Sequence, residues 1–136
     1  MSRNIKFYVT EKEIVIKYGN IVNGIDHLIL TEYFVITIQD KWKNTKPTLN
    51  DANHFIKATE RIGEIEKKSY SGIYLSKLPL TSYAIKAFNF DNSYSSNKFY
   101  SIYGETTNDI EKKLTKKLYE LKIYFYEPDG SAIMLE

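Results

Sequence analysis

The first forty residues alternate between hydrophobic and polar positions in several short runs. Residues 5–9 and 14–18 alternate with a period of two, which is typical of half-buried strands. Asn23-Gly24 predicts a hairpin turn, because a type I′ turn needs positive φ at both central residues, and residues 25–30 are expected to form the returning strand. Residues 33–39 are almost wholly apolar or β-branched and predict a central strand covered on both faces.

Two later segments have the spacing of apolar residues that is typical of amphipathic helices. The first covers residues 49–67, where Thr48 can cap the helix and Asp51 lies favourably in its first turn. The second covers residues 108–121 and is expected to begin with Asn108 as its cap.

The remaining segments predict further strands and turns. Strands are expected at residues 72–77, 82–90, 98–103, 123–126 and 131–135, with a loop at residues 91–97 and a turn at Pro128-Asp129-Gly130. Runs of strands between single helices favour an antiparallel sheet with helices packed on it. We therefore expect one compact α+β domain over residues 1–136, with a mainly antiparallel sheet of about seven to nine strands and two helices.

The segment from Ser69 to Gly104 differs from the rest of the chain in its composition. It is rich in tyrosine and serine and poor in charged residues, a composition found in evolved binding surfaces and also in ordinary half-buried strands. We expect a partner-binding surface centred on the 91–97 loop, with a lone tryptophan elsewhere as a secondary anchor. Its predicted residues are Tyr94, Asn92, Tyr100, Tyr103 and Trp42.

The charge of the chain gives little support to strong nucleic-acid binding. The formal net charge is +2 at pH 7, and Arg3 and Arg61 are the only arginines, although arginine supplies most bidentate contacts to bases. The densest basic cluster is partly balanced by neighbouring acids. If the protein binds nucleic acid, we expect this cluster to contact the phosphates. It consists of Lys112, Lys113, Lys116 and Lys117.

No motif in the chain predicts catalysis or a cofactor. The chain has no cysteine and two histidines, which leaves few ligands for a zinc site, and no glycine-rich phosphate loop is present. His27 follows Asp26 in a predicted strand, where adjacent side chains point to opposite faces. We therefore expect no metal site, no cofactor and no catalytic residues.

These observations favour binding over catalysis. We expect a small non-enzymatic protein of bacterial or phage origin, an inhibitor or immunity-type protein that covers the surface of a protein partner. The first alternative is a nucleic-acid- or nucleotide-binding module that uses lysines and aromatic stacking. The second is a self-assembling subunit of a virion or secretion apparatus, which would form homo-oligomers. No apolar run has the length of a membrane helix, and a cytoplasmic location is expected.

Overall fold

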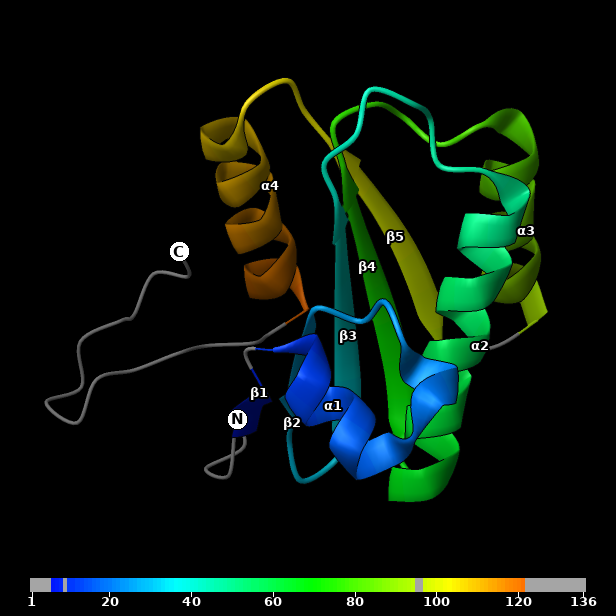
Figure 1. Ribbon diagram of the computed structural model, residues 1–136, viewed down its shortest axis with the longest axis vertical. Helices are drawn as coiled ribbons and strands as arrows, with labels where there is room; N and C mark the ends of the chain where they lie inside the picture. The colour runs from blue at the N-terminus through cyan, green and yellow to red at the C-terminus, as the bar shows by residue number, and fades with distance from the viewer. Residues whose placement is uncertain (1–5, 9, 95–96, 122–136) are drawn as a thin grey trace, which may run out of the picture.

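A five-stranded mixed sheet forms the centre of the protein (Figure 1). The computed structural model describes residues 6–8, 10–94 and 97–121. The strands lie side by side in chain order; the pairs from β1 to β3 are antiparallel and those from β3 to β5 are parallel. The strands are β1 (Lys6–Tyr8), β2 (His27–Leu30), β3 (Phe34–Lys41), β4 (Ser69–Ser76) and β5 (Lys98–Tyr103).

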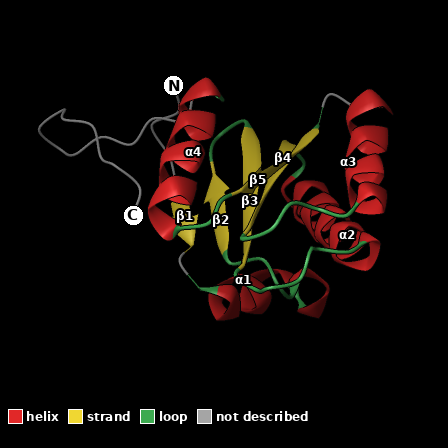
Figure 2. Ribbon diagram, turned by 90° about the horizontal axis from the view of Figure 1, so that it is seen from above, coloured by secondary structure: helices red, strands yellow, loops and turns green. Residues whose placement is uncertain are grey.

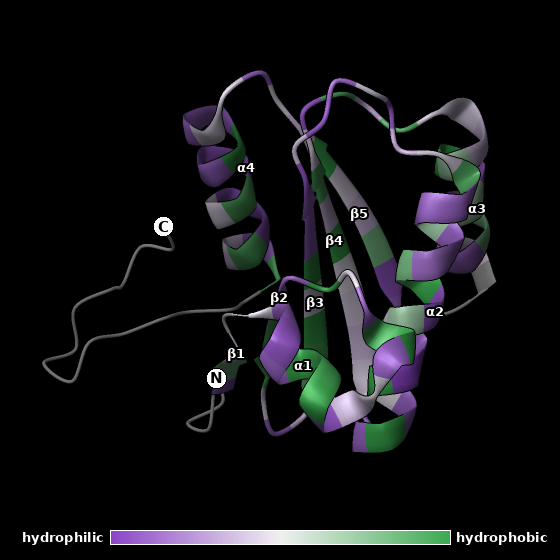
Figure 3. Cartoon of the chain, in the orientation of Figure 1, coloured by the Kyte–Doolittle hydropathy of each residue, from purple (hydrophilic) through white to green (hydrophobic). Residues whose placement is uncertain are grey.

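Helices cover both faces of this sheet. Helices α1, α2 and α3 lie on one face and α4 lies on the other (Figure 2). Helices α2 and α3 are the crossovers between the parallel strands, and α4 turns its hydrophobic side towards the sheet (Figure 3). The helices are α1 (Glu11–Tyr18), α2 (Leu49–Glu66), α3 (Ser82–Tyr94) and α4 (Thr107–Glu120), with a short 3-10 helix, η1 (Asn20–Val22). Among the described residues, no helix is both long and apolar enough to cross a membrane.

Phe55 of α2 lies at the centre of the larger core. Its ring meets Tyr74 edge-on at 5.4 Å and Phe99 at 6.0 Å between ring centroids. The ring fits because β4 has a glycine beneath it: a Cβ atom at Gly72 would lie 2.7 Å from Phe55 and 2.8 Å from Phe99. This close approach sets the distance between α2 and the sheet.

Polar contacts fix the rotation and the start of α2. The buried hydroxyls of Thr37 in β3 and Thr59 in α2 are 2.7 Å apart and share a hydrogen bond. At the start of the helix, the Asp51 backbone N–H donates to the Thr48 hydroxyl at 3.3 Å, and the Thr48 N–H donates to the Asp51 carboxylate at 2.8 Å. The predicted helix at residues 49–67 and its Thr48 cap are therefore confirmed.

The prediction of a mainly antiparallel sheet of seven to nine strands with two helices is wrong. The described residues form five strands and four α-helices, and two segments expected to be strands are helical. Residues 14–18 belong to α1, where buried Ile14 and Tyr18 are four residues apart. Residues 82–90 belong to α3, where Ala84 and Phe88 are buried with the same spacing. Short segments can satisfy both the strand and the helix period, and here packing on the sheet selected the helix.

Smaller predictions also need correction. The Asn23-Gly24 hairpin is absent, because only Gly24 has a positive φ and β1 pairs with β2 across the intervening helices. Thr106, not Asn108, caps α4 by accepting a hydrogen bond from the Asp109 N–H.

The loop expected at residues 91–97 is also different in the structure: Asn92 and Tyr94 lie in α3 instead of a loop. The strands expected at 123–126 and 131–135 and the turn at 128–130 lie outside the described residues.

The contact between Gly72 and Phe55 generates a stability prediction. We expect Gly72→Ala to lower the free energy of unfolding by about 1–3 kcal/mol, because the new methyl group would displace two core rings. The measurement is urea unfolding followed by circular dichroism. Ser71→Ala in the same strand is the control and should change stability by less than about 0.5 kcal/mol. Equal stability of Gly72→Ala and the native protein would contradict this account of the core.

Candidate functional site

Polar side chains gather at one edge of the sheet, under the start of α2. Strands β3, β4 and β5 are parallel and all end at this edge, at the top of Figure 1. Strand β2 runs antiparallel to β3 and begins there. Ligands of open sheets commonly bind outside the carboxyl ends of parallel strands, so a binding site is expected at this edge.

Asp26 immediately precedes β2 and is held against the end of β3. Its backbone N–H donates to the Ile38 carbonyl at 2.9 Å, and its carboxylate accepts a hydrogen bond from the Asp40 N–H at 2.6 Å. Burial raises the pKa of Asp26; the hydrogen bond from the Asp40 N–H and the nearby His27 offset this rise only in part, and the negative charges of Asp40 and Glu11 add to it. The charged form of Asp26 is therefore costly, as expected of a carboxylate placed for binding rather than for stability.

Gln39 lies opposite Asp26 on β3 and faces α2. Strand alternation places it on the same face as Thr37, which bonds to α2. Its side-chain nitrogen would lie 3.4 Å from a Cβ atom at Gly24, so the amide packs against this glycine. Its side-chain oxygen is buried and has no hydrogen-bond partner among the described residues. Buried polar atoms are rarely left in this state, which makes this oxygen a candidate ligand.

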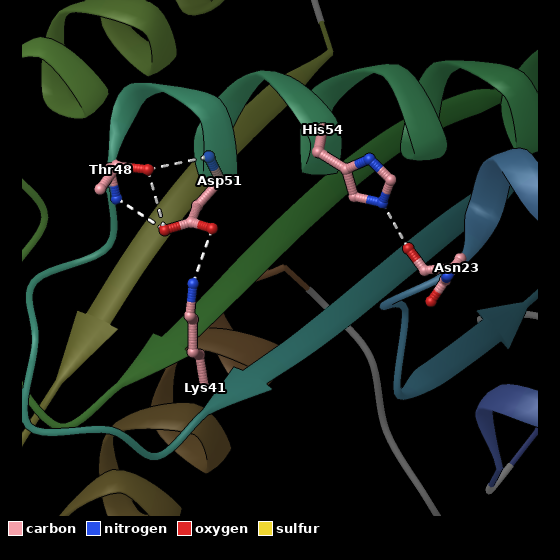
Figure 4. Close-up of polar contacts among 5 residues, drawn as sticks. All are labelled: Asn23, Lys41, Thr48, Asp51 and His54. Atoms are coloured by element: carbon pink, nitrogen blue, oxygen red, sulfur yellow. Dashed lines mark hydrogen bonds and ion pairs between the residues drawn. The ribbon is translucent and has the colours of Figure 1, made fainter.

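Lys41 ends β3 on the same face and is held by α2. Its ammonium lies 2.6 Å from the Asp51 carboxylate (Figure 4). Burial opposes the ionisation of Asp51, but hydrogen bonds from Lys41 and Thr48 outweigh it and lower the pKa of Asp51. Asp51 therefore remains charged and holds the Lys41 ammonium at the start of α2.

Tyr74 lies next to Gln39 in the sheet, and the charges of Asp26 and Asp51 both act on it. It is the neighbour of Gln39 in β4, its side chain is fully buried, and its hydroxyl has no hydrogen-bond partner among the described residues. Burial raises the pKa of Tyr74, and the charges of Asp51 and Asp26 raise it further. Both carboxylates therefore act on one neutral phenol, which can donate a hydrogen bond into the site.

His54 supports the turn that leads into Asp26. Its Nε2 atom is 2.5 Å from the Asn23 carbonyl oxygen, so α2 contacts this turn directly (Figure 4). His54 is exposed on the surface of α2 and helps to position the segment that carries Asp26.

Oxygen atoms dominate this site, and their chemistry fits a hard divalent cation. The Asp26 carboxylate and the Gln39 carbonyl oxygen are ligands that Mg²⁺ and Mn²⁺ accept. The described part of the chain has no group of three or more acidic, histidine or cysteine side chains arranged for a metal. A cation here would therefore keep several waters, as Mg²⁺ commonly does beside one or two protein carboxylates.

The structure separates the residues predicted to form a single binding surface. Asn92 is used internally, because its side chain donates to the Phe99 carbonyl and accepts from the Phe99 N–H. Tyr94 is the last residue of α3. Tyr100 is half-buried on the α4 side of β5, whereas Tyr103 is exposed at the end of that strand. Trp42, directly after Lys41, and Tyr103, at the carboxyl end of β5, lie at the edge that carries the site.

The lysines of α4 pair with aromatic rings and acids on the opposite face of the sheet. Lys117 lies 4.5 Å from the ring centre of Tyr100, and Lys113 lies 5.4 Å from that of Tyr103. Lys113 also pairs with Asp109 at 3.2 Å, and Lys117 with Glu120 at 3.1 Å. Lys112 and Lys116 are exposed and have no ion-pair partner within the described residues.

The main residues of this site were not among those predicted from the sequence. The available signal was an acid before one strand, Asp26, followed by Gln39 and Lys41 at the polar end of the next buried strand. This signal becomes meaningful only when the two strands are known to pair and β4 is known to be parallel to β3. Nothing in the sequence around Tyr74 indicates a functional residue, because its neighbours are those of an ordinary strand.

Comparisons with known proteins give a likeness of fold. No protein-family model and no curated protein matches the chain. The structure of an EndoMS–dsDNA2 complex resembles it with a TM-score of 0.50 and 15% identity, covering 76% of this chain and 38% of that one. A repair endonuclease from Pyrococcus abyssi resembles it with a TM-score of 0.45 and 11% identity, covering 69% of this chain and 45% of that one.

This chain therefore spans less than half of either of those chains, and the first comparison shows a shared fold. The finding contradicts the expected non-enzymatic inhibitor or immunity-type protein of bacterial or phage origin, and it gives no support to a protein partner. The fold that the chain shares occurs in a protein solved with double-stranded DNA.

Proposed function

We propose that this protein binds nucleic acid and hydrolyses its phosphodiester bonds with a divalent cation at the Asp26 site. The observation that carries the proposal is the meeting of Asp26, Gln39 and Lys41 at one sheet edge, beside the Tyr74 hydroxyl, which has no hydrogen-bond partner in the described part of the chain. The shared fold with a DNA-bound protein supports nucleic acid as the phosphate-bearing substrate; this support is by analogy, since one fold can serve many functions.

Each side chain has a distinct role in this proposal. Asp26 and Gln39 would hold the cation through their oxygen atoms. A bound divalent cation neutralises phosphate charge and lowers the pKa of a bound water. Lys41 donates to a phosphate oxygen as a point charge and stabilises the negative charge that develops there. Asp51 is a positioning residue, because it holds Lys41 at 2.6 Å.

Substitutions at the site test this proposal directly. We expect Asp26→Asn and Lys41→Met each to reduce cleavage by about a hundredfold or more, because they remove a cation ligand and a charge aimed at the phosphate. The measurement is cleavage of labelled single-stranded and duplex DNA in Mg²⁺ or Mn²⁺. Calorimetric titration with Mn²⁺ should show binding to the native protein and much weaker binding to Asp26→Asn.

Asp40→Asn is the matched control for the cleavage assay. It makes the same change of charge one residue from Gln39, and strand alternation points its side chain to the other face. Cleavage by Asp40→Asn should remain close to native. Native protein that cuts none of the substrates in either metal would refute the proposed activity, and full activity of Asp26→Asn would refute the assigned site.

The pKa shifts give a second, independent prediction about stability. Folding raises the pKa of Asp26, so ionisation of this group costs stability as pH rises from its unfolded value of about 3.9 through its folded value. Asp26→Asn should therefore have a higher Tm than the native protein at pH 7, and the difference should vanish below about pH 4. Its amide oxygen can still accept the Asp40 N–H.

Asp51→Asn should behave in the opposite way. Folding lowers the pKa of Asp51, so its ionised form stabilises the protein above the unfolded pKa, and this contribution is lost as pH falls through the folded pKa. We expect Asp51→Asn to have a lower Tm at pH 7 and a Tm close to native in acid. Thermal unfolding of both variants between pH 3 and pH 8 is the measurement; the same sign for both would contradict the assigned environments.

A further inference from the structure

We propose that Trp42 is a stacking platform for an unpaired base, so that the substrate carries single-stranded nucleic acid next to the bond that is cut. This inference rests on the proposed function, because it specifies the substrate of the same sheet edge. The loop involved runs from Trp42 to Lys46 between β3 and α2. We call this segment the Trp42 loop.

The Trp42 loop leaves the sheet directly beside the candidate site. Trp42 is the residue after Lys41, whose ammonium contacts Asp51. Its indole is 41% exposed although it is a large hydrophobic side chain. A base that stacks on Trp42 would therefore place its neighbouring phosphates within reach of the residues at the end of β3.

A second loop holds the platform in place. Lys77, directly after β4, lies 5.9 Å from the centre of the Trp42 ring and donates a hydrogen bond to the Asn44 side chain at 2.8 Å. The Trp42 loop is thereby tied to the connection between β4 and α3. A ring held in this way loses little conformational freedom when a ligand stacks on it.

The charge of the Trp42 loop is suited to a phosphate backbone. Lysines occupy positions 43 and 46, and the segment from 41 to 49 has no acidic residue. Within the described residues, Lys43, Lys46 and Lys77 form no ion pair. On α4, by contrast, Lys113 and Lys117 are paired with acids, so the Trp42 loop offers more uncompensated positive charge near the site.

The types of residue at this edge favour an unpaired strand over intact duplex. Stacking on an indole needs a free base face, and bases inside a duplex already stack on one another. Such stacking is worth about 1–3 kcal/mol per base and tolerates every sequence. The commonest specific contact to base edges in a duplex groove is made by arginine or lysine to guanine, and the only arginine in the described residues, Arg61, lies in the C-terminal half of α2, away from this edge.

Fluorescence of the protein's single tryptophan tests the inference. The Asp26→Asn variant, which prevents cutting, is titrated with three labelled DNAs: a single strand, a blunt duplex and a duplex with a single-stranded overhang. We expect strong quenching of Trp42 by the single strand and the overhang and little quenching by the blunt duplex. Binding without quenching, equal quenching by the blunt duplex, or no binding to any DNA at low salt would each overturn the inference.

Variants at the platform provide the second measurement, read as fluorescence anisotropy of the labelled DNA. Trp42→Ala should weaken binding of the single strand by about 5- to 100-fold, and Trp42→Phe should weaken it less, because a smaller ring still stacks. Tyr33→Ala is the matched control, because Tyr33 is an aromatic residue 70% exposed between β2 and β3, at the opposite edge of the sheet. Equal losses at Tyr33 and Trp42 would contradict the platform.

The two proposals fail in distinguishable ways. If the native protein cuts no DNA while single strands still quench Trp42, the platform stands as a binding site and the proposed hydrolysis is wrong. If the native protein cuts blunt duplex while Trp42 remains unquenched, hydrolysis stands and the platform is wrong.

Discussion

The packing of Phe55 over Gly72 is the contact on which the arrangement of the rest depends. A side chain at position 72 would separate α2 from the sheet, and α2 carries Asp51 and His54, which contact the two segments that frame the candidate site. The Thr37–Thr59 hydrogen bond then sets which face of α2 meets β3. A close helix–sheet contact in the middle of the fold thus determines the geometry at its edge.

Several groups at the candidate site lower the stability of the folded protein, as is common at functional sites. Burial opposes the charged form of Asp26, and within the described residues the buried Gln39 oxygen and Tyr74 hydroxyl have no hydrogen-bond partners. Each such group costs free energy that a packed apolar residue would not. Asp51 shows the contrast: it is also partly buried, but Lys41 and Thr48 stabilise its charge and make it a structural anchor.

The sheet topology explains why binding and chemistry share one edge. Three parallel strands send their connections to the same end, so the loops after β3 and β4 meet there and Lys77 contacts Asn44 across them (Figure 1). Helix α4 covers the other face, where Lys113 and Lys117 are engaged with tyrosines and acids. The lysines beside Trp42 follow directly on the end of β3 and therefore lie at the edge that carries the candidate site.

The sequence by itself determined the two long amphipathic helices, the Thr48 cap, the strands with strong β-branched character and a lone tryptophan, Trp42, between two lysines. These features depend on periodicity and on neighbours along the chain. Only the tertiary structure decided that residues 14–18 and 82–90 are helical, because a short segment satisfies either period until it packs on a sheet. It also decided the site, because Asp26 precedes β2 while Gln39 and Tyr74 lie on β3 and β4, and these residues become neighbours only through strand pairing, which no local pattern encodes.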